Sequence, residues 1–253
     1  MLSEVRRRLP GESTVYLGDN ARAPYGPRSA DEVRRFTLEC VGWLLGQDVK
    51  LLVLACNTAT AQALPLVRER SPVPVLGVVR PGAVAAAAST RAGHVGVIAT
   101  AGTVASGAYP AAIGETDPRL RVTQTACPEL VPLVEAGELT GARAETLVGG
   151  YLAELLTGDP AIDTLLLGCT HYPLLRPIIE RVVGEKVAVV DSAFTTALAG
   201  EDLLDALGSR ASTGSTGTHR VATTGEVDAF SSVASRVFGA ALPVVERVSV
   251  EGV

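Results

Sequence analysis

The chain has 253 residues, of which 47% are hydrophobic and 19% charged, and its formal net charge is −5. These values exclude an intrinsically disordered chain, and lysine and arginine are not clustered as in a nucleic-acid-binding surface. No apolar run reaches the roughly 18 residues of a membrane span, and the first residues lack the apolar segment of a signal peptide. We therefore expect a globular cytoplasmic protein with no nucleic-acid or membrane partner.

Short apolar runs typical of β-strands alternate with helical patterns along the chain. The first run, 14–19, is followed by a helical pattern at 29–47 that Ser29 and Glu32 open as a capping box. Strands that are apolar on both faces and separated by helices indicate parallel sheets, so the predicted fold class is α/β. The further strand candidates are 50–56, 73–79, 94–100, 120–127, 164–169, 186–191, 219–225 and the region 244–250.

Two shifts in composition suggest domain boundaries. One is a proline-, glycine- and alanine-rich stretch at 80–92, and the other is the glycine-, serine- and threonine-rich stretch 208–219. The segment after the second stretch is too small to fold alone, so it is expected to pack on the first domain. The prediction is two pseudo-symmetric three-layer α/β domains, 1–80 plus 192–253 and 81–191.

Two stretches of sequence repeat one design. In "LVLACNTATA" (52–61) and in "LLLGCTHYPLL" (165–175), an apolar strand ends at a cysteine that polar residues follow. Ligands of parallel sheets gather at the carboxyl ends of the strands. Because each predicted domain holds one of these stretches, Cys56 and Cys169 are predicted to face each other across an interdomain cleft.

Two facing thiols can invert a stereocentre. A thiolate on one side of a carbon removes a proton, and a thiol on the other side returns one, which gives the mirror image. A helix N-terminus after each strand favours the thiolate and offers N–H donors to a carboxylate. Asn57, Thr58 and Thr170 supply further polar groups, so the residues favour a racemase.

The other two cysteines are interpreted as structural. Cys40 lies within a helical pattern and Cys127 ends a strand without a companion motif, and buried free cysteines usually act as small apolar residues. The chain contains no CxxC pair, which gives little support to a zinc site. Two alternatives stay open: a metal site of Cys56, Cys169 and His171, with Cys127 as a possible fourth ligand, and a non-catalytic amino-acid-binding protein.

Five stretches in order along the chain resemble the glutamate racemase family, within the aspartate/glutamate racemase superfamily, and the likeness covers nearly the whole chain. The resemblance implies interconversion of L- and D-glutamate without metal or other cofactor, supply of D-glutamate for peptidoglycan, and a homodimer. A racemase of another acidic amino acid is the alternative within enzymes. The stretches are "YLGDNARAPYG" (16–26), "LACNTAT" (54–60), "GVIATAGTVASGAY" (96–109), "ACPELVPLVEAG" (126–137) and "LLLGCTHYPLL" (165–175).

The resemblance also implies roles for single residues. Cys56 would be the base toward D-glutamate and Cys169 the base toward L-glutamate. His171 matches an auxiliary acid or base near Cys169, and Glu135 matches a carboxylate that tunes the same side; by itself, Glu135 would be interpreted as a solvated helix residue. The positions that match substrate contacts are Tyr25, Gly26, Asn57, Thr58, Thr170 and His171.

Five further residues allow a structural or a functional interpretation. Thr100 and Thr103 either line the amino-acid site or cap a helix. Asp19 is interpreted as a turn residue that orders the loop before Tyr25. His94 and His219 match no functional position of the family and are interpreted as structural or exposed.

The chain departs from the family pattern at its start. The family opens with a strand and an Asp-Ser-Gly loop, whereas "MLSEVRRRLPGE" (1–12) matches the second half of the helix that follows them. Either a start codon further upstream or a shortened, inactive protein would account for this. Loss of a central strand leaves its neighbours without backbone partners, so residues 1–253 alone are expected to be poorly soluble and weakly active or inactive. Arg80 also departs from the pattern, with no consequence that the sequence reveals.

Overall fold

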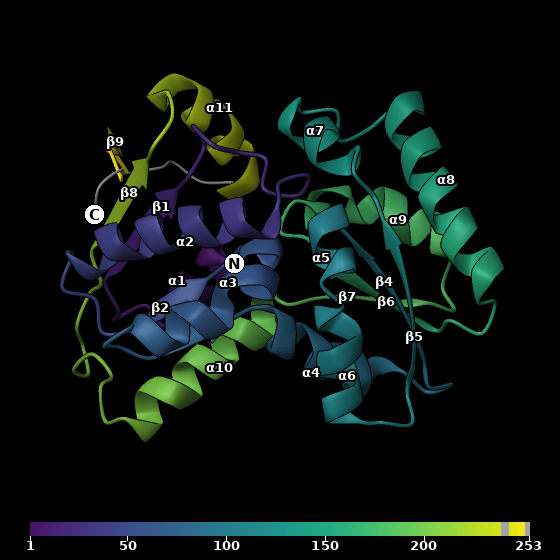
Figure 1. The fold of residues 1–253 in the computed structure, drawn as a ribbon, viewed down its shortest axis with the longest axis horizontal. Helices are drawn as coiled ribbons and strands as arrows, with labels where there is room; N and C mark the ends of the chain where they lie inside the picture. The colour runs from purple at the N-terminus through teal and green to yellow at the C-terminus, as the bar shows by residue number, and fades with distance from the viewer. Residues whose placement is uncertain (239–242, 251–253) are drawn as a thin grey trace.

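The computed structural model describes residues 1–238 and 243–250 (Figure 1). The strands are Thr14–Gly18 (β1), Leu52–Leu54 (β2), Val75–Gly77 (β3), His94–Ala99 (β4), Arg121–Ala126 (β5), Thr164–Gly168 (β6), Ala188–Asp191 (β7), His219–Thr223 (β8) and Val245–Arg247 (β9). The α-helices are Leu2–Arg8 (α1), Ala30–Leu45 (α2), Asn57–Arg70 (α3), Val79–Ser89 (α4), Ala101–Ala105 (α5), Ala108–Thr116 (α6), Leu130–Glu135 (α7), Ala142–Gly158 (α8), Arg176–Val183 (α9), Ala193–Ala206 (α10) and Val227–Phe238 (α11), and Tyr172–Leu175 (η1) forms a 3₁₀ turn.

Four strands form a parallel sheet in the order β5-β4-β6-β7. Successive side chains of a strand point to opposite faces, and β6 is buried on both. Leu165 and Leu167 belong to the apolar cluster beneath α8 and α9, while Leu166 belongs to the cluster with α4 and α6. The consecutive leucines of this stretch are therefore explained by helices on both sides of the sheet. The predicted α/β class with parallel sheets is confirmed.

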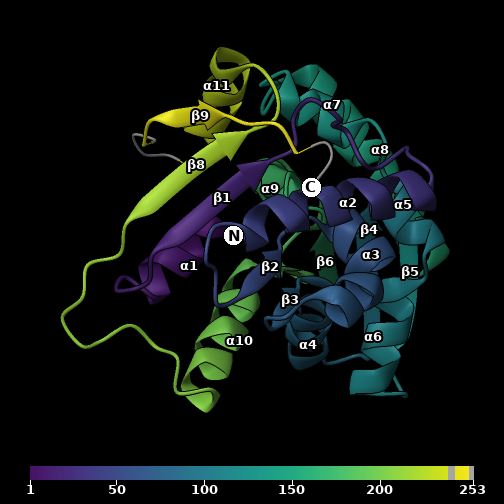
Figure 2. The ribbon, with the colours of Figure 1, turned by 60° about the vertical axis from the view of Figure 1, so that its left-hand side comes forward.

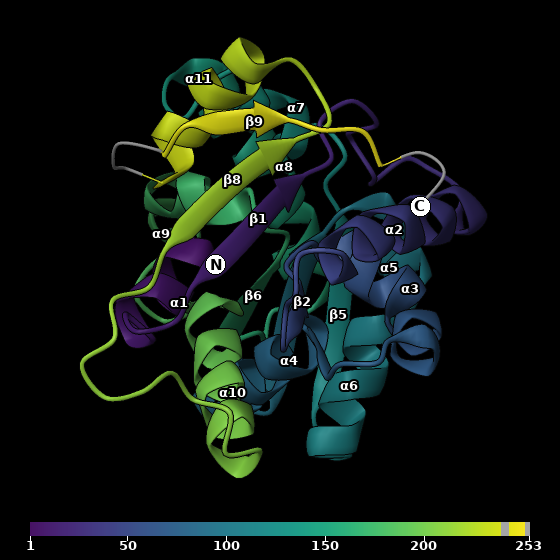
Figure 3. The same ribbon diagram turned by 90° about the vertical axis from the view of Figure 1, so that its left-hand side faces the viewer.

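The other strands form two separate parallel sheets. β1 pairs with β8, which pairs with β9, and β2 pairs with β3. Within residues 1–238 and 243–250, no ladder of backbone hydrogen bonds joins β1 to β2, although Figures 2 and 3 show both strands on the same side of the molecule. The strands β1, β8, β9, β2 and β3 therefore form two sheets rather than one.

The predicted helix at 29–47 is observed as α2 and ends two residues earlier. The Ser29 side chain accepts a hydrogen bond from the Glu32 N–H, and the Glu32 carboxylate accepts one from the Ser29 N–H, which is the predicted capping box. The strands predicted at 50–56 and 73–79 are shorter, because β2 and β3 pair over three residues only. α4 begins within the second of these stretches, and Pro81 in its first turn needs no N–H partner.

The end of the chain returns to its beginning. β8 lies beside β1, and α10 packs against α1 as well as against α4 and β3. This return was predicted, while the boundaries at 80/81 and 191/192 stay a prediction. None of the helices in the described ranges is both long enough and apolar enough to cross a membrane.

Candidate active site

Cys56 stands at the junction between β2 and α3. It is the N-cap residue of α3, so Asn57 and Thr58 form the start of the helix. Burial raises the pKa of the Cys56 thiol, while the N–H groups of Ala59 and Thr58 act to lower it, and the charge of a Cys169 thiolate raises it further. Burial outweighs the helix N-terminus here, so the protonated thiol is the favoured form of Cys56.

Cys169 occupies the equivalent junction after β6 and has a different environment. Its Sγ lies 3.8 Å from His171 Nδ1, and His171 Nε2 lies 2.6 Å from Glu135 Oε1. Burial of the imidazole opposes its charged form, but the hydrogen bonds to Cys169 and Glu135 raise the pKa of His171 to about 10. A protonated imidazole donates from both nitrogens, so this arrangement is complementary to a thiolate at Cys169 and a carboxylate at Glu135.

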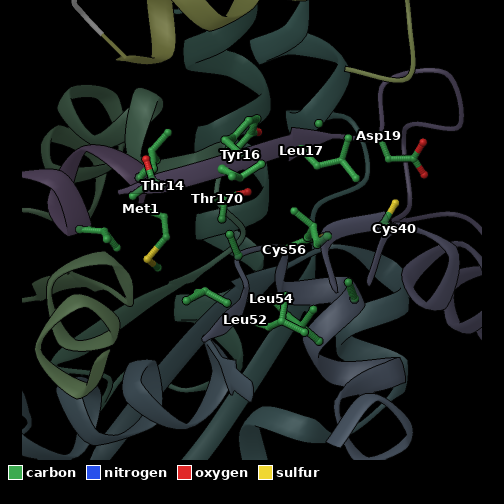
Figure 4. Close-up of a pocket in the computed structure, with 18 of the residues that line it drawn as sticks. Met1, Thr14, Tyr16, Leu17, Asp19, Cys40, Leu52, Leu54, Cys56 and Thr170 are labelled. Carbon is green, nitrogen blue, oxygen red and sulfur yellow. The ribbon is translucent and has the colours of Figure 1, made fainter. Parts of the chain in front are cut away.

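Both thiols line one cavity of about 1700 Å³. Cys169 is 6% exposed and Cys56 is half-buried. Figure 4 labels Cys56 and Thr170 among the residues that line this space; they follow β2 and β6 in the chain. All the site residues predicted from the sequence line it: Cys56, Cys169, Glu135, His171, Tyr25, Gly26, Asn57, Thr58 and Thr170.

Beside Cys56, hydrogen bonds between side chains connect the start of α3 to α5 and α6. Thr58 Oγ1 lies 2.8 Å from Thr100 Oγ1 and 3.3 Å from Thr103 Oγ1. The Tyr109 hydroxyl donates to Asn57 Oδ1 at 2.5 Å. Because these groups are buried, the contacts hold the start of α3 against α5 and α6 in a fixed arrangement.

The loop after β1 reaches across to the same place. The Gly26 carbonyl accepts a hydrogen bond from the Gly102 N–H at 3.0 Å. A Cβ atom added to Gly26 would lie 2.9 Å from Thr100 Cβ, so only glycine fits this approach without a shift of its neighbour. Asp19 orders the loop, because its carboxylate accepts hydrogen bonds from Arg22 and Tyr25. The predicted turn role of Asp19 agrees with these contacts.

Thr100, Thr103, Cys127 and Cys40 differ in how they lie relative to the cavity. Thr100 both caps α5 and lines the cavity, whereas Thr103 is fully buried behind it. Cys127 is buried, as predicted. The prediction that Cys40 is a core residue is wrong, because its side chain is half-buried and lines the cavity. The break between β1 and β2 leaves the face of α2 that carries Cys40 open to the cavity.

His94, His219 and Arg80 do not line the cavity. His94 contacts Asp159 through Nδ1 at 3.0 Å, and His219 contacts the Thr14 hydroxyl through Nδ1 at 2.8 Å. Both histidines therefore have the structural role that was expected. Arg80 is exposed on α4, and nothing in the structure explains its departure from the family pattern.

Tyr16 is among the cavity residues that the sequence analysis did not identify. Tyr16 on β1 lines the cavity and is labelled in Figure 4, and burial, with the nearby charges of Cys56 and Glu135, raises its pKa to about 12. A tyrosine in an apolar strand resembles any half-buried strand residue, so the pattern carried no signal of this position. Its proximity to Cys56 depends on the side-by-side placement of β1 and β2.

The side chains considered as metal ligands lack a metal-binding arrangement. Within the described ranges, no three or more histidine, cysteine, aspartate or glutamate side chains are grouped so as to hold a metal ion. The alternative of a metal site at Cys56, Cys169 and His171 therefore has no geometric support there.

Comparison with known proteins places the chain in a family. The family model described as Asp/Glu/Hydantoin racemase matches residues 1–199. The chain belongs to this racemase family. The match contains both cysteine junctions, the Glu135 and His171 pair and the loop at Gly26, so the geometry above is that of a member of the family.

Individual members of the family are similar over most of their length. A glutamate racemase of Oceanobacillus iheyensis is 44% identical over 238 residues, which are 94% of this chain and 86% of that protein. A crystal structure of a glutamate racemase isoform from Bacillus anthracis has a TM-score of 0.93 at 43% identity and covers 98% of this chain and 92% of its own. The glutamate racemase of Francisella tularensis, in complex with D-glutamate, has a TM-score of 0.91 at 30% identity, covering 100% of this chain and 93% of its own.

Proposed function

We propose that this racemase acts on glutamate and interconverts the L- and D-enantiomers by proton transfer between Cα and two cysteines. The observation that carries the proposal is that Cys56 and Cys169 line one cavity, each at the end of a parallel strand. The names of the relatives support glutamate as the substrate, as does D-glutamate in the Francisella tularensis structure.

The electrostatics support one resting state of the pair. With the pKa of His171 raised to about 10, the imidazolium supports a thiolate at Cys169, and the raised pKa of Cys56 supports a thiol. In this state the Cys169 thiolate removes the Cα proton of L-glutamate, and the Cys56 thiol donates its proton to the opposite side of the planar carbanion. D-glutamate leaves, and the enzyme now has a Cys169 thiol and a Cys56 thiolate, which is the state that accepts D-glutamate.

The residues around the thiols would orient the substrate. Asn57 and Thr58 on one side and Thr170 on the other supply hydroxyl and amide groups within the cavity. Tyr25 and Gly26 reach the cavity from the loop after β1. We propose that these groups bind the carboxylates and the ammonium group, so that Cα lies between the two sulfurs.

The thiols and the imidazole provide both the acid and the base of this scheme, so the proposal requires no metal or other cofactor. D-glutamate is a component of peptidoglycan, and we propose that the chain supplies it in the cytoplasm as a homodimer. Two alternatives differ in their observable chemistry. A racemase of another acidic amino acid would exchange the Cα proton of that substrate faster, and a binding protein would hold glutamate without exchanging it.

Single cysteine variants test the two-base scheme. Cys56→Ser and Cys169→Ser are each expected to abolish racemisation of glutamate, measured by circular dichroism, because either change removes one of the two bases. Each variant should still eliminate chloride from one enantiomer of a β-chloro analogue, with opposite enantiomers for the two variants. Racemisation by either variant at more than a small fraction of the wild-type rate would contradict the proposal. Tight glutamate binding by the wild type, without exchange or turnover, would favour the binding-protein alternative.

A further inference from the structure

Tyr109 lies behind the cavity, between the two cysteine junctions. It belongs to α6, is fully buried and is not among the residues that line the cavity. Burial raises the pKa of Tyr109, and the charges of Cys169 and Asp191 act in the same direction, so the hydroxyl stays protonated and can donate a hydrogen bond. This buried hydroxyl is a polar group that the two-base scheme does not use.

The hydroxyl of Tyr109 reaches the residue that follows Cys56. It donates to Asn57 Oδ1 at 2.5 Å, and in the part of the chain that the structure describes the Asn57 side chain has no other hydrogen bond. Asn57 is 3% exposed and lines the cavity. A side-chain amide has one oxygen that accepts and one NH₂ group that donates. Because Tyr109 occupies the oxygen, the NH₂ group is the part of this amide that is left to the cavity, where it can donate to a carboxylate.

The ring of Tyr109 lies against the residue that precedes Cys169. A Cβ atom added to Gly168 would lie 2.8 Å from Tyr109 Cε2, which is closer than real side chains approach, so the ring packs directly on the backbone at the end of β6. At the hydroxyl end, a Cβ atom added to Gly82 would lie 3.3 Å from Tyr109 Oη. The backbones at these two glycines therefore leave the side chain little room to shift.

One rigid side chain thus connects the two cysteine junctions. Its ring touches the neighbour of Cys169, and its hydroxyl binds the neighbour of Cys56. Proton transfer on opposite sides of one carbon depends on where the two bases lie, and a small misplacement of reacting groups costs a large factor in rate. A phenol ring has no internal rotation that changes its length, so the distance that it spans is fixed.

We propose that Tyr109 is a positioning residue of this racemase. Its hydroxyl directs the Asn57 NH₂ group toward a carboxylate of the substrate, and its ring holds the junctions of Cys56 and Cys169 at a fixed separation. The inference rests on the proposed function, because it concerns glutamate bound between the two thiols. Loss of the hydroxyl should therefore weaken binding, and loss of the ring should also slow the proton transfers.

Tyr109→Phe removes the hydroxyl and keeps the ring. KM for both enantiomers should rise about threefold to tenfold, as expected for the loss of one hydrogen bond, while kcat should change by less than about twofold. In a chain that already contains Asn57→Ala, Tyr109→Phe should leave KM unaltered, because there is no amide left to orient. An equal rise of KM with and without Asn57→Ala would overturn the orienting role.

Tyr172→Phe is the matched control for a lost buried hydroxyl. Tyr172 is also fully buried, and its hydroxyl donates to the Cys127 carbonyl at 2.9 Å. This variant should lose stability without a rise in KM, so a rise equal to that of Tyr109→Phe would show a merely structural effect and overturn the proposal.

Tyr109→Leu removes the ring as well as the hydroxyl. Its kcat should fall at least about tenfold below that of Tyr109→Phe, because the two bases are no longer held apart by a side chain of fixed length. Equal kcat values for the two variants would overturn the spacing role. The phenylalanine variant keeps the orienting role testable if the leucine variant does not fold.

A readout without turnover separates this inference from the proposed function. The chain contains two asparagines, Asn20 and Asn57, so isotope-labelled asparagine gives two side-chain amides in an NMR spectrum, and Asn57→Ala assigns them. In the ligand-free protein, nuclear relaxation should show a rigid Asn57 NH₂ group in the wild type and in Tyr172→Phe, and a mobile one in Tyr109→Phe. Equal rigidity in all three proteins would overturn the proposal. If the rigidity depends on Tyr109 but the wild type does not racemise glutamate, the proposed function fails while the orienting contact is supported.

Discussion

The substitution Glu135→Gln isolates the electrostatic contribution of one carboxylate to the Cys169 side. The substitution keeps the size of the side chain and an oxygen that can accept a hydrogen bond from His171 Nε2, but it removes the negative charge. In the wild type, His171 Nε2 lies 2.6 Å from Glu135 Oε1. An opposite charge at hydrogen-bond distance shifts a pKa by about 1–3 units. Because the Glu135 side chain is 38% exposed, solvent screens its charge, and the pKa shift should lie at the lower end of this range. We expect the pKa of His171 to fall by about one unit, or about 1.4 kcal/mol of preference for the imidazolium.

The assay is an NMR titration of labelled histidine. The chain has three histidines, so His94→Gln and His219→Gln assign the signals without further labelling. In the wild type, His171 should titrate at about 10. The value of kcat/KM should fall by at most about tenfold, and by the same factor for both enantiomers, because L- and D-glutamate have equal free energies in water. A wild-type His171 that titrates near the ordinary value of 6.5, or a value that Glu135→Gln leaves unchanged, would refute the reasoning.

The same histidine predicts a pH dependence of stability. Its pKa is higher in the folded state than the ordinary 6.5, so its stabilisation is fully present below about pH 6.5 and is lost as the pH rises through about 10. The free energy of unfolding from urea titrations should fall over this window. The fall should be smaller in His171→Asn, which serves as the matched variant because groups outside the contacts of His171 with Cys169 and Glu135 titrate equally in both proteins. Equal falls would contradict the paired imidazolium.

Two further substitutions test the contacts that join the sides of the cavity. Gly26→Ala should raise KM and lower stability, because the added Cβ would lie 2.9 Å from Thr100 Cβ. Gly114→Ala, where a Cβ meets nothing within 4 Å, should leave KM unchanged and should not lower stability, because alanine favours the helix α6 over glycine. Tyr109→Phe should lower the free energy of unfolding by about 1–3 kcal/mol in urea titrations, because it leaves the buried Asn57 oxygen without its donor. A loss below about 0.5 kcal/mol would show that this hydrogen bond contributes little to stability.

The residues that the sequence identified share a local signal. An apolar run that ends in a cysteine and polar residues predicts a strand followed by a helix, so Cys56 and Cys169 could be located without the structure. Ser29 and Glu32 likewise predicted the start of α2, because a capping box is complete within four residues. Local chemistry of this kind needs no information about distant parts of the chain.

Contacts between distant segments could not be predicted in this way. Glu135 and His171 are 36 residues apart, and only the family resemblance singled out Glu135, which by itself has the pattern of a solvated helix residue. Tyr16 and Cys40 line the cavity because β1 and β2 do not pair, and a strand pattern contains no information about its partners. The extent of the cavity along β1 and β2 likewise emerges only when the strands are placed in space.

The central claim is that two bases act on opposite sides of one carbon, and solvent deuterium tests it most directly. Purified chain is incubated with L-glutamate in D₂O, and both enantiomers are isolated early in the reaction and examined by mass spectrometry. The account predicts deuterium at Cα of the D-glutamate formed, while the remaining L-glutamate keeps its protium. Early deuterium at equal levels in both enantiomers would show that one base serves both sides and would contradict the account.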